Sequence, residues 1–494
     1  MQDEPSDAQQ EQQRQFIPNT FLNLPEKYAH LSPTDYLSAL IHHIESYRHV
    51  INVHIGHFIT HQQWELLDED WRSALLPDKQ CLSNSEEWIE SLIRMTTDAA
   101  PNADWPDSLK SFILKTRELA LPRQNGMSTQ QVIETLDKRI TPGMTSKKIH
   151  EVERMAPVIK ELAAEHKVAS IVDLGAGQGY LSRALAFKTN LKVLAVDSSA
   201  IQTCGAKRFD EKVAKFLKKQ DKILQLHHVT ELITPDNASS VLSKWDNDHH
   251  LQQKEDGKKE TTEKWLLTGL HTCGDLASMM LTLFATHQEM TCFVNVGCCY
   301  HFLTEQSEDR KGRPEVGFPL SSGLKRRNYR LGSKAAMLSC QAPVRWTDQP
   351  QETRTAFEHH FFRALLQLIM VEKGLTDITT APIVGRLNNK KDFTSFPVYV
   401  KAALHRLKMP IDSITEEEAQ AYYDQGIQMQ ADQQITIFWT LRALLAPVLE
   451  SIILVDRWLY LTETIEDSPT KQVYLWPLFD PILSPRNMVI VATK

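Results

Sequence analysis

The sequence predicts an α/β fold built on a doubly wound parallel sheet, and three observations lead to this prediction. The run 171–180, Ile-Val-Asp-Leu-Gly-Ala-Gly-Gln-Gly-Tyr, places a buried strand directly before a glycine-rich turn. A helical pattern follows, with apolar Leu181, Ala184 and Leu185 on one face. The segment 191–197, Leu-Lys-Val-Leu-Ala-Val-Asp, then has the character of a second buried strand. Strands that alternate with helices in this way are typical of doubly wound sheets.

The chain before the glycine-rich turn is expected to be mainly helical. Residues 1–18 are polar and are expected to be a disordered tail. From 19 to 135, apolar residues recur at helical spacing, which predicts a helical N-terminal domain. A turn at 141–146 then supplies an N-cap for a helix over 147–166. The sheet domain is therefore expected to span 136–494.

Beyond the second strand, the pattern continues with a basic helix at 200–219 and is interrupted by two insertions. Residues 234–264 are polar and of mixed charge, and they are expected to be a disordered insertion. Residues 303–445 depart from the alternation of strand and helix, and we expect a loop and several helices there before the last two strands. Further strands are expected at 223–226, 265–270, 291–296, 458–461 and 488–492.

The glycine-rich turn predicts a cofactor site. Its spacing is G-x-G-x-G, whereas the dinucleotide fingerprint G-x-G-x-x-G would need glycine where this chain has Tyr180. Such a turn offers bare backbone N–H groups and a helix N-terminus to a nucleotide-like ligand. Asp197 ends the next strand about 20 residues further on, where a carboxylate can accept both hydroxyl protons of a ribose.

This pattern is typical of class I methyltransferases, which bind S-adenosylmethionine (SAM). The structural alternative is an ordinary βαβ unit with a glycine turn and a surface aspartate. The residues expected to bind the cofactor are Asp173, Gly175, Ala176, Gly177, Gln178, Gly179, Asp197 and Ser198.

Two later strands end in clusters of reactive residues, 270–276 (LHTCGDL) and 297–301 (GCCYH). In a doubly wound sheet, the carboxyl ends of these strands face the same crevice as the cofactor. Methyl transfer needs an aligned nucleophile and often a base that removes its proton. We therefore expect catalytic roles for His271, Asp275, Cys299 and His301.

Each of these residues also has a structural interpretation. A cysteine near a strand end is often a small buried apolar residue, His271 could bond to a backbone carbonyl, and Asp275 could cap the following helix. A zinc site formed by His271, Cys273, Cys299 and His301 fits the ligand types. No C-x-x-C or other familiar metal spacing is present, so no metal is expected.

A basic cluster of five cations follows the second of these strands: Lys325, Arg326, Arg327, Arg330 and Lys334. In a chain of net charge −7, a local concentration of cations is suited to phosphates, although a solvated loop is the alternative. The residues expected to bind substrate are Lys325, Arg326, Arg327 and Arg330.

Composition indicates in which cellular compartment the protein is expected. The 494 residues are 42% hydrophobic, and the seven cysteines are odd in number without the spacing of a disulfide framework. The N-terminus has no signal-peptide pattern, and charged residues interrupt the apolar runs. We therefore expect a soluble protein of the cytoplasm or nucleus, without a membrane partner.

The motifs together resemble those of the methyltransferase-like 25 family, which includes a protein named for a ribosomal RNA adenine dimethylase domain. The resemblance covers about residues 135 to 494 and implies a Rossmann-like class I methyltransferase domain with SAM as cofactor. The matching segments are KKIHEVE (147–153), VDLGAGQGY (172–180), HTCGDL (271–276), NVGCCYHF (295–302), GFPLS (317–321) and LFDPILSPRN (478–487).

The His-x-Cys-Gly and Cys-Cys-x-His segments are also similar to those of transfer-RNA 2′-O-methyltransferases, where they border the active site. That similarity implies the same for His271, Cys273, Cys299 and His301. Adenine dimethylases instead carry an Asn/Asp-Pro-Pro-Tyr/Phe tetrapeptide after the fourth strand, where this chain reads Leu-His-Thr-Cys. N6-adenine dimethylation is therefore not implied.

The sequence favours a SAM-dependent methyltransferase that acts on RNA or a ribonucleoprotein. One alternative is a protein methyltransferase, in which the basic cluster binds an acidic partner. Another is a non-catalytic protein that keeps a SAM pocket for stability or sensing.

Overall fold

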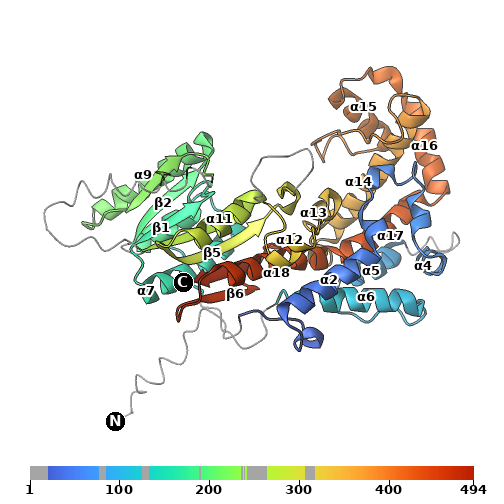
Figure 1. Cartoon of the computed structure of the whole chain (residues 1–494). Helices are drawn as coiled ribbons and strands as arrows, with labels where there is room; N and C mark the ends of the chain where they lie inside the picture. Colours follow the sequence, from blue (N-terminus) through green and yellow to red (C-terminus); the bar gives the residue numbers. More distant parts are fainter. Residues whose placement is uncertain are drawn as a thin grey trace, which may run out of the picture. The chain divides into compact units, whose positions relative to one another are not determined.

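The computed structural model describes residues 21–76, 85–124, 133–188, 191–234, 237, 240–241, 264–305 and 317–494, which cluster into two compact units (Figure 1). The first unit takes the described parts of Met1–Leu37, Leu121–Leu331 and Ser451–Lys494, and the second takes those of Ser38–Ala120 and Gly332–Glu450. The predicted tail at 1–18 and most of the predicted insertion at 234–264 lie outside the described residues.

A seven-stranded sheet forms the centre of the first unit, with strand order β3-β2-β1-β4-β5-β7-β6. The first five strands in this order are parallel, and β7 pairs antiparallel with both β5 and β6. This topology confirms the predicted α/β class. The strands are β1 (Ser170–Leu174), β2 (Lys192–Asp197), β3 (Leu226–Thr230), β4 (Trp265–Cys273), β5 (Met290–Cys298), β6 (Gln472–Pro477) and β7 (Met488–Thr493).

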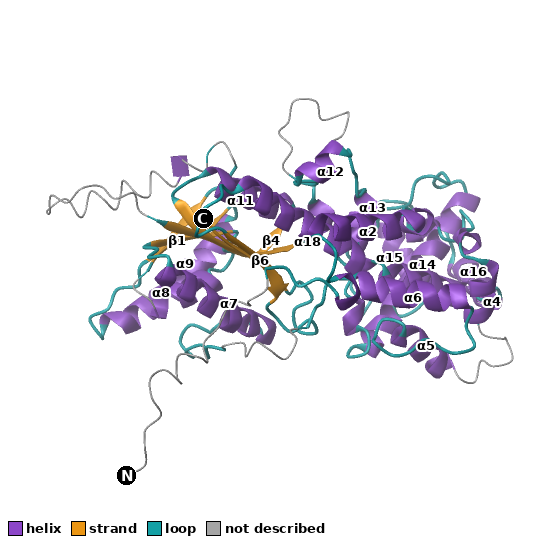
Figure 2. Ribbon diagram, turned by 60° about the horizontal axis from the view of Figure 1, so that its bottom comes forward, coloured by secondary structure: helices purple, strands orange, loops and turns teal. Residues whose placement is uncertain are grey.

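Helices cover both faces of this sheet. One buried apolar cluster joins one face of the strands to α7, α8 and α9, whereas α11 packs on β4 and β5 from the other side (Figure 2). The expected helix over 147–166 is α7, whose N-cap is Thr145. Helix α7 spans Ser146–Glu165. The other helices of this unit are α8 (Tyr180–Lys188), α9 (Ala200–Lys218), α11 (Asp275–Thr286), α12 (Ser322–Arg326) and most of α18 (Ala446–Thr464).

The strand predictions differ from the structure at three places. The segment 458–461 lies inside α18 and is not a strand, because a short, mostly buried apolar run is compatible with either element. The strand expected at 223–226 begins only at Leu226. Strand β6 at 472–477 was not predicted from the sequence.

The second unit is helical and joins two regions that are far apart in the sequence. Arg442 donates to the backbone carbonyls of Ile51 and Val53 at 3.0 Å, and the rings of Phe58 and Phe438 meet at 5.3 Å. The N-terminal helices and the helical insertion, predicted as separate regions, therefore share one core. The helices are α2 (Pro33–Ser46, which begins in the first unit), α3 (Arg48–Ile51), α4 (Glu69–Leu75), α5 (Ser85–Arg94), α6 (Asp107–Leu119), α13 (Ser333–Leu338), α14 (Pro350–Glu372), α15 (Phe396–Arg406), α16 (Glu416–Gln428) and α17 (Ala431–Leu444).

Among the described residues, one stretch, Ala431–Thr464, is long and apolar enough to cross a membrane. Most of its apolar window, 89%, is buried within the protein. A core helix of a folded domain has this same character, so the stretch is weak evidence for a membrane span.

Candidate active site

The turn after β1 contains three glycines in a left-handed conformation. The φ angles of Gly175, Gly177 and Gly179 are +73°, +55° and +65°, a region that other residues rarely adopt. The three glycines differ in how much room a side chain would have. A Cβ atom on Gly179 would lie 2.8 Å from the His228 ring, whereas one on Gly177 would meet nothing within 4 Å. The turn is thus closely packed at one end and open at Gly177.

The end of β2 holds this turn in place. The N–H groups of Gly175 and Ala176 both donate to the carbonyl of Val196, at 2.9 and 3.1 Å. The N–H of Gly177 donates to Oδ2 of Asp197 at 2.8 Å. The sequence suggested bare amides, but these three N–H groups are engaged within the protein. The open space over Gly177 is bordered by the Asp197 carboxylate.

Asp197 keeps room for a ligand. Its Oδ1 accepts the N–H of Ser199 at 2.8 Å, and the side chain is half-buried beside the exposed Ser198. Each carboxylate oxygen offers two lone pairs, so one remains on each oxygen for a ribose hydroxyl. The open space at Gly177 and this carboxylate fit the adenosyl group of SAM.

Asp173 lies beneath the turn. Its carboxyl is only 2% exposed and accepts the Ser182 hydroxyl at 2.5 Å. Burial raises the pKa of Asp173 to about 6, and the bond from Ser182 opposes this. Such a placement favours support of the turn from α8 over the direct cofactor contact expected from the sequence.

A buried cation supports the same turn from the other side. Arg183 is 1% exposed and donates to the carbonyl of Gln178 at 3.0 Å. Its Nε lies 2.6 Å from Asp210, which also bonds to His228 at 2.5 Å. The Gln178 side chain reaches Gln202 at 2.6 Å. The turn is therefore positioned by side chains of α8, α9 and β3.

Three thiols meet where β4 and β5 end. Cys273 and Cys298 are direct partners in the register of the two strands, and Cys299 follows in a left-handed conformation with φ +51°. The Sγ atom of Cys273 lies 3.4 Å from that of Cys298 and 3.2 Å from that of Cys299. The remaining Sγ pair is 3.5 Å apart. We call these three residues the thiol cluster.

The thiols of the cluster differ in acidity. The hydrogen bond from Cys298 lowers the pKa of the Cys273 thiol to about 6, against the effect of partial burial. The same contact, together with deeper burial, raises the pKa of the Cys298 thiol. Cys273 is therefore the more acidic thiol of this pair.

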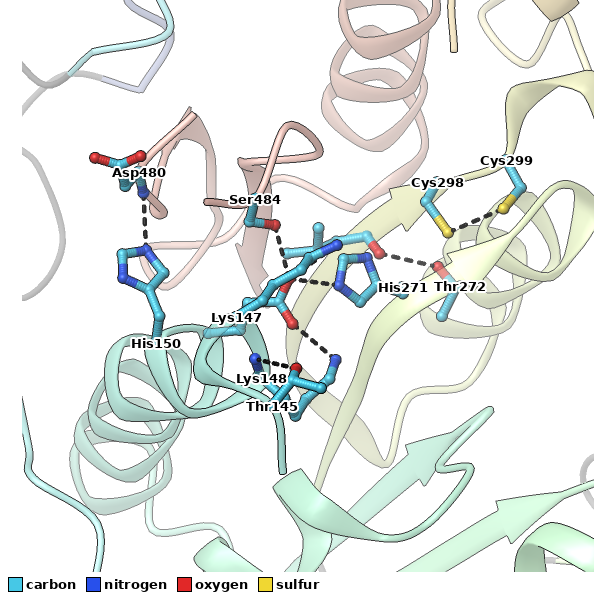
Figure 3. A network of polar contacts seen from close by, with 12 residues as sticks. Thr145, Lys147, Lys148, His150, His271, Thr272, Cys298, Cys299, Asp480 and Ser484 are labelled. Carbon is cyan, nitrogen blue, oxygen red and sulfur yellow. Dashed lines mark hydrogen bonds and ion pairs between the residues drawn. The ribbon is translucent and has the colours of Figure 1, made fainter. Parts of the chain in front are cut away.

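His271 is oriented by a buried carboxylate from α7. Its Nε2 lies 2.7 Å from Oε1 of Glu151, which also accepts the Ser484 hydroxyl at 2.7 Å (Figure 3). His271 itself has φ +67°, beside a register shift between β4 and β5. A non-glycine residue in this conformation costs about 1 kcal/mol, which the contact to Glu151 offsets.

Glu151 stays ionised although it is fully buried. Burial acts to raise its pKa, but the bond from His271 and the charge of Lys148 at 2.7 Å hold the pKa of Glu151 at about 2. Glu151 is therefore charged at neutral pH and engages Nε2 of His271, so the Nδ1 of the ring faces away from Glu151.

The sequence did not assign roles to this network. Glu151 lies in the segment KKIHEVE and Ser484 in LFDPILSPRN, and His150 Nε2 accepts the backbone N–H of Asp480 at 2.9 Å between the same two segments (Figure 3). Both segments were noted only for the family resemblance. A signal was available, because His150 and Glu151 are polar residues within an otherwise apolar helix face.

The other predicted catalytic residues lie nearby but are engaged differently. Asp275 is the first residue of α11, and its Oδ1 accepts the N–H of Thr304 at 2.8 Å. The N-cap of this helix is Gly274, which has no side chain to cap it. His301 is exposed, with its ring 4.0 Å from that of Phe302.

The predicted substrate-binding cations lie on α12 and the turn after it. All four of these residues, Lys325, Arg326, Arg327 and Arg330, are exposed. The segment that leads into α12 is anchored, because the N–H groups of Leu320 and Ser321 donate to the fully buried Asp456 at 2.8 and 2.9 Å. Lys334 belongs to the second unit and is half-buried.

Comparison with known proteins agrees with this geometry. The family profile described as "Methyltransferase domain" matches residues 147–306, which include α7, the glycine-rich turn and the thiol cluster. The human "Probable methyltransferase-like protein 25" is 26% identical, with 93% of this chain and 96% of that protein covered. The mouse protein of the same name is 27% identical, with coverages of 76% and 79%.

Solved structures resemble the chain more distantly. Magnesium protoporphyrin IX methyltransferase from Synechocystis, solved with bound SAH, is 17% identical over 32% of this chain and 63% of its own, with a TM-score of 0.20. Coclaurine N-methyltransferase, bound to N-methylheliamine and SAH, is 11% identical with a TM-score of 0.23 and coverages of 94% and 100%.

The domain match and the relatives confirm three predictions. The resemblance to the methyltransferase-like 25 proteins holds over most of the chain, the activity is that of a methyltransferase, and its cofactor is SAM. The acceptor is not specified by any of them.

Proposed function

Given a SAM-dependent methyltransferase related to the methyltransferase-like 25 proteins, we propose that the acceptor is RNA or a ribonucleoprotein. The observation that carries this proposal is the exposed cation segment, Lys325, Arg326, Arg327 and Arg330, which follows the active-site strand β5. Clustered lysines and arginines bind the phosphates of nucleic acids and release counterions when they do so.

The net negative charge of the whole chain makes the exposed cation segment a distinct local site for phosphates. The protein carries a formal net charge of −7, so a polyanion would be repelled by most of the surface. Four cations within six residues provide a local exception. The anchoring of Leu320 and Ser321 on Asp456 holds that segment to the same unit as the glycine-rich turn.

In this reaction, some residues of the chain would bind the cofactor and others would remove the acceptor's proton. SAM supplies an electrophilic methyl group when it is bound. Gly177 leaves room for the cofactor, and Asp197 accepts hydroxyl protons of its ribose. His271 would accept the acceptor's proton on Nδ1 while Glu151 fixes its ring through Nε2, because a positioned imidazole is suited to proton removal near neutral pH.

The test uses the full chain with labelled SAM and cell extract. RNase treatment of the extract should abolish incorporation, whereas protease treatment should leave label in RNA. The variant in which Lys325, Arg326, Arg327 and Arg330 are all changed to Glu should lose transfer but keep SAM affinity, measured by isothermal titration calorimetry. Gly177→Arg should lose SAM binding itself, because the new side chain fills the open space.

Two outcomes would overturn the proposal. Label that survives RNase and disappears with protease would identify a protein methyltransferase. Full transfer to RNA by the four-residue Glu variant would show that the cation segment does not bind the acceptor.

A further inference from the structure

The thiol cluster is built by the backbone of the sheet. Neighbouring parallel strands place Cys273 and Cys298 side by side on one face, since these residues are direct register partners. The left-handed turn at Cys299 then brings a third Sγ back over the strand ends. The register shift between Leu270 and Thr272 precedes this pair of cysteines. Asn295 holds it in place, because its amide donates to Thr272 Oγ1 at 3.0 Å and to the carbonyl of Gly269 at 3.3 Å.

The arrangement has the ligand set of a thiolate metal site. Three Sγ atoms lie within 4.8 Å of one another, and the distances are 3.2 to 3.5 Å. Sulfur ligands of a tetrahedral zinc ion lie about 2.3 Å from the metal, and hence about 3.8 Å from each other. A bound ion would therefore need to separate the sulfurs by only a few tenths of an ångström.

A buried cation balances the charge that such a site would carry. Three thiolates and one divalent ion have a net charge of −1. Arg457 is fully buried beside the strand end, where a Cβ on Gly297 would lie 2.3 Å from its Nη1. Its Nη2 is buried without a hydrogen-bond partner among the described residues. A buried guanidinium is costly unless negative charge lies near it, and the charges of both Asp456 and Cys298 stabilise the charged form of Arg457.

We propose that Cys273, Cys298 and Cys299 bind one zinc ion and leave its fourth coordination position open. Within the described parts of the chain, no further histidine, cysteine or carboxylate joins these three. Cys273 is exposed, so the cluster is reachable from solvent. Three protein ligands with an open position are typical of zinc sites that bind a further ligand.

No metal was expected from the sequence, and this ligand set also differs from the one weighed there as an alternative (His271, Cys273, Cys299 and His301). Nε2 of His271 is engaged by Glu151, and Cys298 takes the place expected for a histidine. Soft thiolates select zinc or copper(I) over magnesium and calcium. The proposal concerns metal binding alone and does not depend on the nature of the methyl acceptor.

The test measures metal in the full chain, purified under reducing conditions without oxygen and supplied with zinc. We expect about one zinc per chain for the wild type by plasma mass spectrometry. Replacing zinc with cobalt(II) should produce a thiolate-to-cobalt absorption band. Cys273→Ser should reduce metal content at least tenfold, and Cys298→Ser should do the same.

Cys292→Ser is the matched control, because Cys292 is a buried thiol of the same strand outside the cluster. This variant should keep its zinc and its cobalt band. Cys273 is exposed, so Cys273→Ser tests the site even if the change at Cys298 prevents folding. SAM binding, measured separately, reports whether each variant is folded.

Two results would overturn the proposal. One is a wild-type protein that stays metal-free after zinc is supplied while all three thiols react with a thiol reagent. The other is loss of two hydrogens in the intact mass under these conditions, which would identify a disulfide within the cluster.

Discussion

The two halves of the sheet's carboxyl edge are built in different ways. At β1 and β2, the glycine-rich turn is held by the end of β2 and by side chains of the adjoining α8, α9 and β3. At β4 and β5, the contacts that position His271 come from residues far away in the sequence. His271 is held by Glu151 from a helix 120 residues earlier, and Glu151 also meets Ser484, which is 333 residues away.

We propose that this difference separates a cofactor half from an acceptor half. A pocket built mainly from one local segment suits a cofactor that is the same in every reaction of this class. A side-chain network places individual groups against one acceptor. Substitutions in the two halves should therefore have different consequences for stability and for cofactor affinity.

Glu151→Ala should have the largest effect on stability. It removes a buried carboxylate that holds His271, Lys148 and Ser484, and it leaves polar partners unsatisfied. We expect the free energy of unfolding of the sheet unit to fall by about 3 kcal/mol, measured by denaturant titration.

The control is Glu165→Ala, on an exposed position of the same helix. It should change stability by less than about 0.5 kcal/mol. Equal losses from both variants would contradict the role given to the network.

The glycine-rich turn offers a matched pair of smaller changes. Gly179→Ala forces a Cβ to within 2.8 Å of His228 in a left-handed conformation, and it should cost about 2 kcal/mol of stability. Gly177→Ala has open space around it and should cost about 1 kcal/mol.

SAM affinity, measured by calorimetry on both folded variants, should show the reverse order, because only Gly177 borders the open space. A larger loss of SAM affinity for Gly179→Ala would place the cofactor elsewhere along the turn.

The two buried carboxylates give opposite responses to pH. Asp173 has a pKa raised from 3.8 to about 6, so its contribution to stability is complete below about pH 4 and is lost as the pH rises through 6. Glu151 has a pKa lowered from 4.5 to about 2, so its contribution is present above pH 4.5 and is lost as the pH falls towards 2.

Asp173→Asn should therefore flatten the change in stability between pH 4 and 6, by about 2 kcal/mol, while leaving acid unfolding below pH 4 unchanged. Melting temperatures of wild type and variant across this range provide the measurement. Parallel curves for the two proteins would show that Asp173 does not titrate there.

Local patterns in the sequence predicted the cofactor half well. The turn at 175–179, the helix over 147–166 and the strand ending at Asp197 each follow from residues close together in the chain. The acceptor half was predicted less completely. The position of the reactive clusters followed from strand order, but the pairing of His271 with Glu151 depends on tertiary contacts that no local pattern contains.

The same limit explains the errors elsewhere. Residues 458–461 are apolar and mostly buried within α18, and a run of four such residues does not distinguish a strand from a helix. The grouping of the N-terminal helices with the helices of 332–450 depends on contacts such as that of Arg442 with Ile51.

The position of β7 between β5 and β6 has a consequence for how the protein acquires its structure. Cys292 pairs with Thr493, so all of the second unit's later segment is synthesised between the two partners. Closing so long a loop is slow, although its entropic cost grows only logarithmically with length. The intervening helices can reach their native contacts while the sheet is still incomplete, and the final antiparallel strands should be the last to dock.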